Sequence, residues 1–386
     1  MKKKNTKFIL ITMILIIAVY VGWQAYSQFL QKDITDQYKK ADSFYEKGEF
    51  EEAKTIYADL LNKSRKHKFA LGEKQSELVY RLAICNKKIG DSAKAETLLN
   101  QITDQFKNSE YIDEALLELG ELAEAKSDLK KANDLYDKIL NEYPNSNIFY
   151  NALYAKAHIY KLQNKFLNAL SPLEKVILKS DNAKLKNMAH REIEDINVKL
   201  IFSPIPTKDS VIYKVKKGDS LGAIAKRFNT TVGLIKKSNK LKNDIIRTGK
   251  RLKITSGAGF SIKVYTKSNK LILKNNGVIL KTYAVATGTH DGTPLGNFKI
   301  VNKLKNPTWY TAGAIVSADS PKNVLGTRWM GITEKGYGIH GTIKPESIGK
   351  QSTEGCIRMY NKEVEELFDL VPVGISVIII KTQNNK

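Results

Sequence analysis

One cysteine and one histidine near the C-terminal end of the chain could together form a nucleophilic site. Cys356 lies 16 residues after His340, within the segment GYGIHGTIKPESIGKQSTEGCIRM. A cysteine attacks as its thiolate, and a neighbouring histidine is the usual base that removes the thiol proton. Such a pair is weak evidence by itself, because most His and Cys residues at this spacing never meet in a fold. It favours cysteine nucleophilic catalysis as the first hypothesis.

The elements that must position this pair are short strands. Residues 260–381 contain apolar residues in a period of two, broken by Gly, Asn and Pro. Alternation of this kind is typical of half-buried β-strands. The sequence therefore predicts a β-dominated domain over 260–381. Its clearest strands are expected at SIKVYTKS, KLILKNN, VILKTYAVATG, NFKIVNK and SVIIIK.

Several separate motifs in this region resemble the L,D-transpeptidase family with the YkuD-type catalytic domain. They are Thr293–Gly296, Asn306–Tyr310, Leu325–Trp329, Ile339–Thr342 and Thr353–Met359. The resemblance implies that peptidoglycan stem tetrapeptides are the substrate and that a cysteine acyl-enzyme is the intermediate. It further implies that an amine acceptor resolves this intermediate into a 3→3 cross-link.

The resemblance also implies roles for individual residues. Cys356 would be the nucleophile, His340 the base, and the Gly341 carbonyl the group that orients the imidazole. The backbone N–H groups of Gly355 and Cys356 would donate to the oxyanion. The residues expected to bind substrate are Thr353, Glu354, Arg358, Trp309, Tyr310 and Trp329. For Arg358, pairing with Glu363 or capping a strand is the alternative, and each aromatic residue is equally compatible with a place in the core.

One position departs from the family pattern. The family often has histidine two residues before the cysteine, where this chain has Glu354. A carboxylate there disfavours the thiolate by like-charge repulsion unless a lysine or Arg358 compensates. The departure bears on substrate preference and pH optimum and leaves the nucleophile unchanged.

Three functions remain open at this point: an L,D-transpeptidase, an L,D-carboxypeptidase that uses the same residues with water as acceptor, and a non-catalytic peptidoglycan-binding scaffold. The sequence contains no metal-ligand cluster and no glycine loop of the kind that binds phosphate. The chemistry is therefore expected to need no cofactor and no metal.

A second small module precedes the catalytic region. Residues 211–255 predict a strand, two short helices and a second strand, with a turn at Gly218 and Asp219. The segment YKVKKGDSLGAIAKRF and Asn239 resemble the LysM family, with Thr248-Gly249 where Pro-Gly is usual. This resemblance implies a βααβ fold that binds N-acetylglucosamine-containing glycans such as peptidoglycan.

Residues 36–200 predict paired amphipathic helices. A small residue followed four positions later by a bulky one recurs at Ala53/Tyr57, Ala95/Leu99, Ala132/Tyr136 and Ala169/Leu173. The recurrence is close to the ~34-residue helix–turn–helix period, so the region resembles tetratricopeptide repeats. Such repeats bind a protein partner or space domains, and Cys85 within them is expected to be structural. Two prolines within residues 201–210 predict a linker.

The N-terminus predicts a membrane-directed segment. Lysines lie within residues 1–7, and an apolar stretch follows within residues 8–26. We expect an uncleaved transmembrane helix, with the N-terminus cytoplasmic and the body of the protein extracytoplasmic, in the periplasm or cell wall. A signal peptide cleaved near Ala25-Tyr26-Ser27 is the alternative.

The overall composition is consistent with a multidomain globular protein. Of the 386 residues, 63 are Lys or Arg and 40 are Asp or Glu, a net charge of +23. Only eight of the basic residues are arginine, which disfavours the specific reading of DNA bases. The excess of lysine is interpreted as solvation of the surface, with attraction to an anionic envelope as the alternative. Two cysteines are too few for a disulfide framework.

Overall fold

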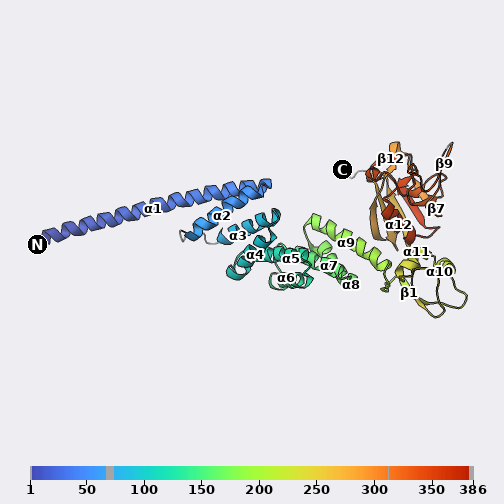
Figure 1. Cartoon of the computed structure of the whole chain (residues 1–386), viewed down its shortest axis with the longest axis horizontal. Helices are drawn as coiled ribbons and strands as arrows, with labels where there is room; N and C mark the ends of the chain where they lie inside the picture. The colour runs from blue at the N-terminus through green and yellow to red at the C-terminus, as the bar shows by residue number, and fades with distance from the viewer. Residues whose placement is uncertain (1, 67–73, 312, 382–386) are drawn as a thin grey trace. The chain divides into compact units, whose positions relative to one another are not determined.

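The computed structural model describes residues 2–66, 74–311 and 313–381. It divides into two compact units, Met1–Gln163 and Asn164–Lys386, which are described separately below (Figure 1). The first unit is helical. The second contains two further helices, a small βααβ module and a β-dominated domain, which confirms the predicted fold class apart from its transmembrane helix.

The first unit is a succession of helices in which each packs against the next. They are α1 (Lys2–Lys47), α2 (Phe50–Lys66), α3 (Lys74–Lys88), α4 (Ser92–Gln105), α5 (Ile112–Ala125), α6 (Leu129–Glu142) and α7 (Phe149–Leu162). The small-then-bulky pairs predicted from the sequence form the seams: Ala95 and Leu99, for example, are fully buried. At Gly120 a methyl group would overlap the Tyr136 ring, so neighbouring helices approach closely there.

The helix pairs are separated by turns that the local sequence explains. Gly90 has a φ of +94°, a conformation that glycine adopts without a steric cost. Directly after it, the Asp91 side chain accepts a hydrogen bond from Lys94 N–H and caps α4. Asp128 caps α6 in the same way through Lys131 N–H.

The transmembrane helix predicted within residues 8–26 is wrong, and so is the membrane-anchored location that depended on it. In the part of the chain that the structure describes, no helix combines the length and the apolar character that crossing a membrane requires. The uncharged apolar run from Phe8 to Trp23 is 16 residues, whereas a span needs about 20. The same helix then continues through charged residues to Lys47.

The second unit begins with α8 (Phe166–Lys179) and α9 (Ala183–Ile201), and α9 packs against the last strand of the catalytic sheet, β5 (Val278–Ala284). The Glu194 carboxylate on α9 accepts hydrogen bonds from Thr282 N–H at 3.0 Å and from Thr282 Oγ1 at 2.9 Å. Lys281 bridges Asp195 on α9 and Glu366 of the catalytic domain. The helix therefore covers a strand edge whose N–H group would otherwise be unpaired.

The βααβ module has the predicted element order. Strand β1 (Ser210–Lys214) pairs antiparallel with β2 (Arg251–Thr255), and α10 (Leu221–Arg227) and α11 (Val232–Ser238) lie between them in sequence. The Asn239 side chain fastens the second strand, because it accepts from Lys253 N–H and donates to the Lys253 carbonyl. The Lys253 ammonium donates to the carbonyls of Leu200 and Ser203 at the end of α9. A cation at a helix C-terminus is stabilising, so this contact joins the module to α9.

The catalytic domain is built on an eight-stranded sheet of order β13-β11-β10-β7-β14-β3-β4-β5. The remaining bounds are β3 (Phe260–Tyr265), β4 (Lys270–Asn275), β6 (Thr287–Gly288), β7 (Gly296–Lys305), β8 (Trp309–Thr311), β9 (Ala314–Val316), β10 (Arg328–Ile332), β11 (Gly338–His340), β12 (Gln351–Thr353), β13 (Ile357–Arg358), α12 (Asn361–Leu370) and β14 (Ser376–Ile380). Strand β14 is central and pairs parallel with β3 and antiparallel with β7.

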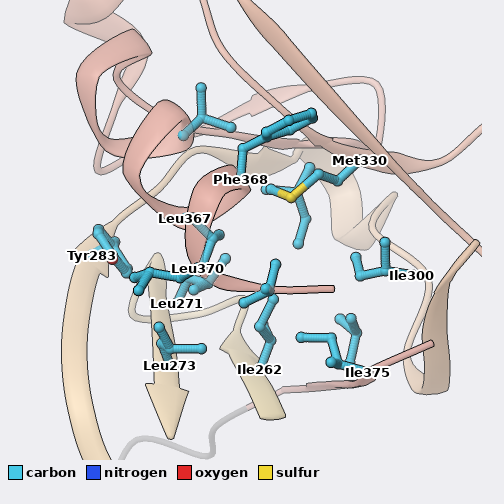
Figure 2. Packing of buried hydrophobic residues seen from close by; sticks show 14 of the residues in the cluster. Ile262, Leu271, Leu273, Tyr283, Ile300, Met330, Leu367, Phe368, Leu370 and Ile375 are labelled. Carbon is cyan, nitrogen blue, oxygen red and sulfur yellow. The ribbon is translucent and has the colours of Figure 1, made fainter. Parts of the chain in front are cut away.

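The core of this domain lies between the sheet and α12. Figure 2 shows Phe368 of α12 next to Met330 of β10, with Leu367 and Leu370 of the same helix nearer to Leu271 and Ile262 of the strands. Most of these side chains are fully buried. Burial of this kind contributes about 1.5–3 kcal/mol for each large apolar side chain, so the sheet is a rigid support for the loops at its edge.

Candidate active site

The strand register brings the predicted nucleophile and base to one face of the sheet. Strands β11 and β13 are parallel, with Ile339 opposite Ile357 and His340 opposite Arg358. Because alternate residues of a strand share a face, His340, Arg358 and Cys356 belong to the same face. Ile339 and Ile357 point to the other face, where both are buried in the core.

These side chains lie in one cleft of about 590 Å³. The predicted site residues that line it are Trp309, Tyr310, Trp329, His340, Thr353, Glu354, Cys356 and Arg358. Gly341 and Gly355 are not among the lining residues, but they are the sequence neighbours of His340 and Cys356, which are. Residues that the sequence did not single out also line it, including Leu325, Gly336 and Lys344. Within residues 2–66, 74–311 and 313–381, no three His, Cys, Asp or Glu side chains are arranged to hold a metal ion.

The His340 imidazole is buried and held in one orientation. Its Nδ1 lies 2.7 Å from the Gly341 carbonyl oxygen, and the Trp329 ring stacks on it with the ring centroids 5.9 Å apart. A carbonyl only accepts, so Nδ1 carries the proton and Nε2 is the nitrogen free to accept one. Burial lowers the pKa of His340 to about 4, although the Gly341 contact opposes this shift. At neutral pH the ring is therefore an uncharged base.

The Cys356 thiol is partly exposed at the floor of the cleft. Its Sγ donates to the Gly336 carbonyl oxygen at 3.6 Å. Burial raises the pKa of this thiol, whereas a backbone hydrogen bond from Gly338 and the charge of Arg358 lower the pKa. Glu354 raises the pKa further by like-charge repulsion, as the departure from the family pattern led us to expect.

The thiol and the imidazole are thus both uncharged in the resting site. The proton must leave sulfur as the new bond forms, instead of being transferred beforehand to make a stable ion pair. Because Sγ donates to the Gly336 carbonyl oxygen, a transfer of its proton to Nε2 of His340 would first require the thiol to turn. An arrangement of this type supports general-base-assisted attack on an acyl carbon.

The turn that precedes Cys356 has little conformational freedom. Gly355 has a φ of +137°, and a methyl group on it would meet the Tyr337 ring and the Gly292 carbonyl oxygen. The Thr353 hydroxyl donates to the Cys356 carbonyl at 2.7 Å and accepts from Gly355 N–H at 3.2 Å. The Gly355 N–H predicted for the oxyanion is therefore occupied in this state. Among the described residues, the N–H of Cys356 has no acceptor, and it is the better placed of the two donors.

Arg358 faces the cleft beside the nucleophile. Its guanidinium donates to Ser347 Oγ at 3.1 Å, and its Nε has no hydrogen-bond partner among the described residues. Pairing with Glu363 and a purely structural role were the alternatives. The side chain lines the cleft and forms no ion pair with Glu363 in the described part of the chain. Its charge therefore remains available to a negatively charged or carbonyl group in the cleft.

The three predicted aromatic walls differ in their surroundings. Tyr310 is 73% exposed and stands on the β8–β9 hairpin. Trp309 lies next to it and is partly buried. Trp329 belongs to β10, directly opposite His340 in the antiparallel pair, where it covers the imidazole. Among the described aromatic ring pairs, Trp329 is the one that stacks on His340.

Asn361, at the start of α12, is a site residue that sequence reasoning missed. Its side chain accepts from Thr342 N–H at 2.9 Å and donates to the Thr342 carbonyl at 2.8 Å. A methyl group on Gly341 would collide with the same amide. Asn361 therefore fixes the turn whose carbonyl holds His340. The two segments are 19 residues apart, and no local pattern reveals the contact.

Comparisons with known proteins agree with this architecture. The family model described as the L,D-transpeptidase catalytic domain matches residues 259–380. A LysM domain matches residues 213–255, and tetratricopeptide repeats match residues 37–67, 77–109 and 114–146. All three resemblances predicted from the motifs are confirmed.

Relatives from Bacillus support the assignment. YqjB of Bacillus subtilis (strain 168), whose name places it among the L,D-transpeptidases, is 43% identical over 129 residues, which are 32% of this chain and 71% of YqjB. YkuD of the same organism, similarly named, is 34% identical over 173 residues, 43% of this chain and 97% of YkuD. YkuD of Bacillus licheniformis is 34% identical over 176 residues, 44% of this chain and 98% of that protein.

The sheet and its cleft belong to an L,D-transpeptidase catalytic domain that follows a LysM domain in the chain. The chain is a member of the L,D-transpeptidase family, with a YkuD-type catalytic domain, a peptidoglycan-binding LysM domain and tetratricopeptide repeats.

Proposed function

We propose that this protein forms 3→3 cross-links in peptidoglycan through a cysteine acyl-enzyme. The observation that carries the proposal is the shared face of β11 and β13, which presents Cys356, His340 and Arg358 to one cleft. The family membership supplies the class of reaction, and the arrangement of the three side chains supports the assignment of roles.

In the first half-reaction, Cys356 attacks the carbonyl carbon between the third and fourth residues of a stem tetrapeptide. Nε2 of His340 takes the thiol proton as the S–C bond forms. The carbonyl oxygen becomes an oxyanion, to which the Cys356 N–H donates. When the C–N bond breaks, His340 returns the proton to the leaving amine, and a free D-amino acid departs. The product is a thioester between Cys356 and the third residue.

In the second half-reaction, the side-chain amine of another stem peptide attacks the thioester. His340 accepts a proton from this amine and passes it to the departing sulfur, which restores the thiol. The new amide joins the third residues of two stems. Water in place of the amine would release a tripeptide, and the enzyme would then be an L,D-carboxypeptidase.

The test is mass spectrometry of purified tetrapeptide muropeptides after incubation with the full chain. A cross-linked dimer that has lost one terminal D-residue is expected with the wild-type protein and with the Cys85→Ala variant, which is the matched control for loss of a thiol. The dimer should be absent with Cys356→Ala and reduced by at least about 10³-fold with His340→Ala.

Other outcomes contradict the proposal. Tripeptide without dimer would assign the carboxypeptidase activity instead. Unchanged muropeptides, from a folded protein that still binds peptidoglycan, would reduce the chain to a wall-binding scaffold. Dimer formation by Cys356→Ala would exclude the proposed nucleophile.

A further inference from the structure

A second cleft lies where the LysM domain meets the catalytic domain, away from Cys356. It has a volume of about 530 Å³. One wall is α11 and the turn that follows it, and the other comprises the end of β7 and of α12. The two domains are in direct contact here, because Leu234 of α11 is part of the core of the catalytic domain and Lys237 pairs with Asp369 at 2.7 Å.

The lining of this cleft is basic. It contains five lysines, which are Lys236, Lys237, Lys240, Lys303 and Lys305, against two carboxylates, Asp244 and Asp369. Lys236 pairs with Asp244 at 2.5 Å, so both carboxylates are already engaged. Within the described residues, no carboxylate pairs with Lys240 or Lys305, and both are exposed. The cleft therefore retains a net charge of +3 in a concave site, where the field of like charges is focused.

Lys303 is partly buried, and its ammonium donates to the carbonyls of Phe368 and Val371. Burial lowers its pKa to about 8, so this charge is held at an energetic cost. Lys305 lies two residues along the same strand and on the same face, about 7 Å away. An anion that approached both would offset the repulsion between them.

The size and chemistry of the cleft indicate its ligand. A volume of about 530 Å³ exceeds that of a single inorganic ion many times over, since one water occupies about 30 Å³. The described residues that line the cleft include no arginine, and lysine binds phosphate as a compact point charge that does not require the planar, bidentate geometry of a guanidinium. We propose that this cleft binds an anionic polymer with repeating phosphodiester groups.

The surrounding unit suits such a ligand. Residues 164–386 contain 38 Lys and Arg against 17 Asp and Glu, a net charge of +21. The positive charge of this unit would attract an anionic polymer, and the cleft, which is lined by residues of both the LysM domain and the catalytic domain, would bind it. The proposal does not depend on transpeptidation, and the Cys356→Ala variant should bind the polymer as tightly as the wild type does.

The test is fluorescence anisotropy of a fluorescein-labelled oligo(glycerol phosphate) titrated with the full chain. The double variant Lys240→Gln/Lys305→Gln should weaken binding about tenfold and make the dependence of log K on log salt shallower by about 1.4. The matched control is Lys208→Gln/Lys270→Gln, which removes the same charge from exposed positions of the same unit. An oligoglutamate of equal charge should bind more weakly than the phosphodiester.

Equal losses of affinity in the two double variants would show that the basic unit attracts the polymer nonspecifically, and this result would overturn the proposal of a binding site in the cleft. Equal binding of oligoglutamate would overturn the phosphodiester assignment. Circular dichroism establishes whether each variant is folded. If the double variant is not folded, the single variant Lys305→Gln replaces it, and this variant should weaken binding about threefold.

Discussion

The two cysteines of the chain lie in contrasting surroundings, one in the helical repeats and one at the catalytic sheet. Cys85 is fully buried on α3 among apolar side chains, and burial raises its pKa to about 11. Cys356 is also shifted upward by burial, but it reaches the cleft and has Gly338 N–H and Arg358 beside it. A thiol is reactive when substrate can reach it and when nearby hydrogen-bond donors or positive charges stabilise its thiolate. Burial alone disfavours the thiolate.

The largest expected difference between the two regions is in thiol reactivity. Iodoacetamide at pH 7 should alkylate Cys356 at least about 10³-fold faster than Cys85, since Cys85 must wait for the repeats to open. Peptide mapping by mass spectrometry measures both rates in one sample. The Cys356 rate should also rise with pH to above 9, because the resting thiol is uncharged. A rate independent of pH above 6 would reveal a preformed thiolate and contradict the resting state described above.

The next effect is on stability near the buried imidazole. Because the pKa of His340 falls from 6.5 to about 4 on folding, the unfolded chain binds the extra proton first, and stability falls as pH drops through this window. The loss between pH 7 and pH 5 is about 2 kcal/mol. Hydrogen exchange of the β10–β11 peptides, corrected for intrinsic rates, measures it.

The stability of the repeats near Glu114 should depend on pH in the opposite direction to that of the catalytic sheet near His340. Burial raises its pKa to about 8, so its contribution is present at low pH and is lost as pH rises from 4.5 toward 8. After correction for intrinsic exchange rates, peptides of α5 should therefore be more strongly protected at pH 5 than at pH 7. The His340→Gln variant should remove the pH dependence of the sheet and leave that of α5. Parallel responses in both regions would contradict the assignment.

The smallest expected effect is on the rate of the reaction. A comparison of two asparagine variants distinguishes a residue that positions the catalytic base from one that only stabilises the fold. Asn361 fixes the turn behind His340, whereas Asn86 in the repeats donates to the Leu82 carbonyl at 2.7 Å. Asn361→Ala should lower kcat of the cross-linking assay about tenfold with KM nearly unchanged, because the base is misplaced.

Asn86→Ala is the control, and it should lower thermal stability while leaving kcat unchanged. If Asn361→Ala changed only the melting temperature, its role would be structural. Partial rescue of kcat by Asn361→Asp, which keeps the acceptor for Thr342 N–H, would support positioning.

Much of the site could be predicted because strand alternation and short motifs are local. The period-two runs located the main strands, and the motif residues that line the cleft were named from the sequence. Contacts between distant segments could not be predicted in this way. The Asn361 clasp on Thr342 and the engagement of Gly355 N–H by Thr353 depend on turns formed only after the sheet assembles.

The N-terminal prediction failed for a different reason. A run of apolar residues gives the same local sequence pattern whether it spans a membrane or forms part of a longer helix. The structure places Phe8–Trp23 inside a helix of 46 residues that is charged at both ends. The apolar run of 16 residues is shorter than the roughly 20 residues that a membrane span needs, and this length decides the outcome.

Helix α9 covers strand β5, and this contact determines whether the edge of the catalytic sheet is exposed when the domain is produced as a shorter fragment. Strand β5 ends the sheet, and Glu194 occupies the N–H of Thr282 that a further strand would seek. A catalytic fragment cut after the repeats, and so lacking α9, would present a bare ladder edge of the kind that pairs with other chains. Helix α9 thus protects the β5 edge against pairing with other chains, and a catalytic fragment without this helix would be more prone to self-association.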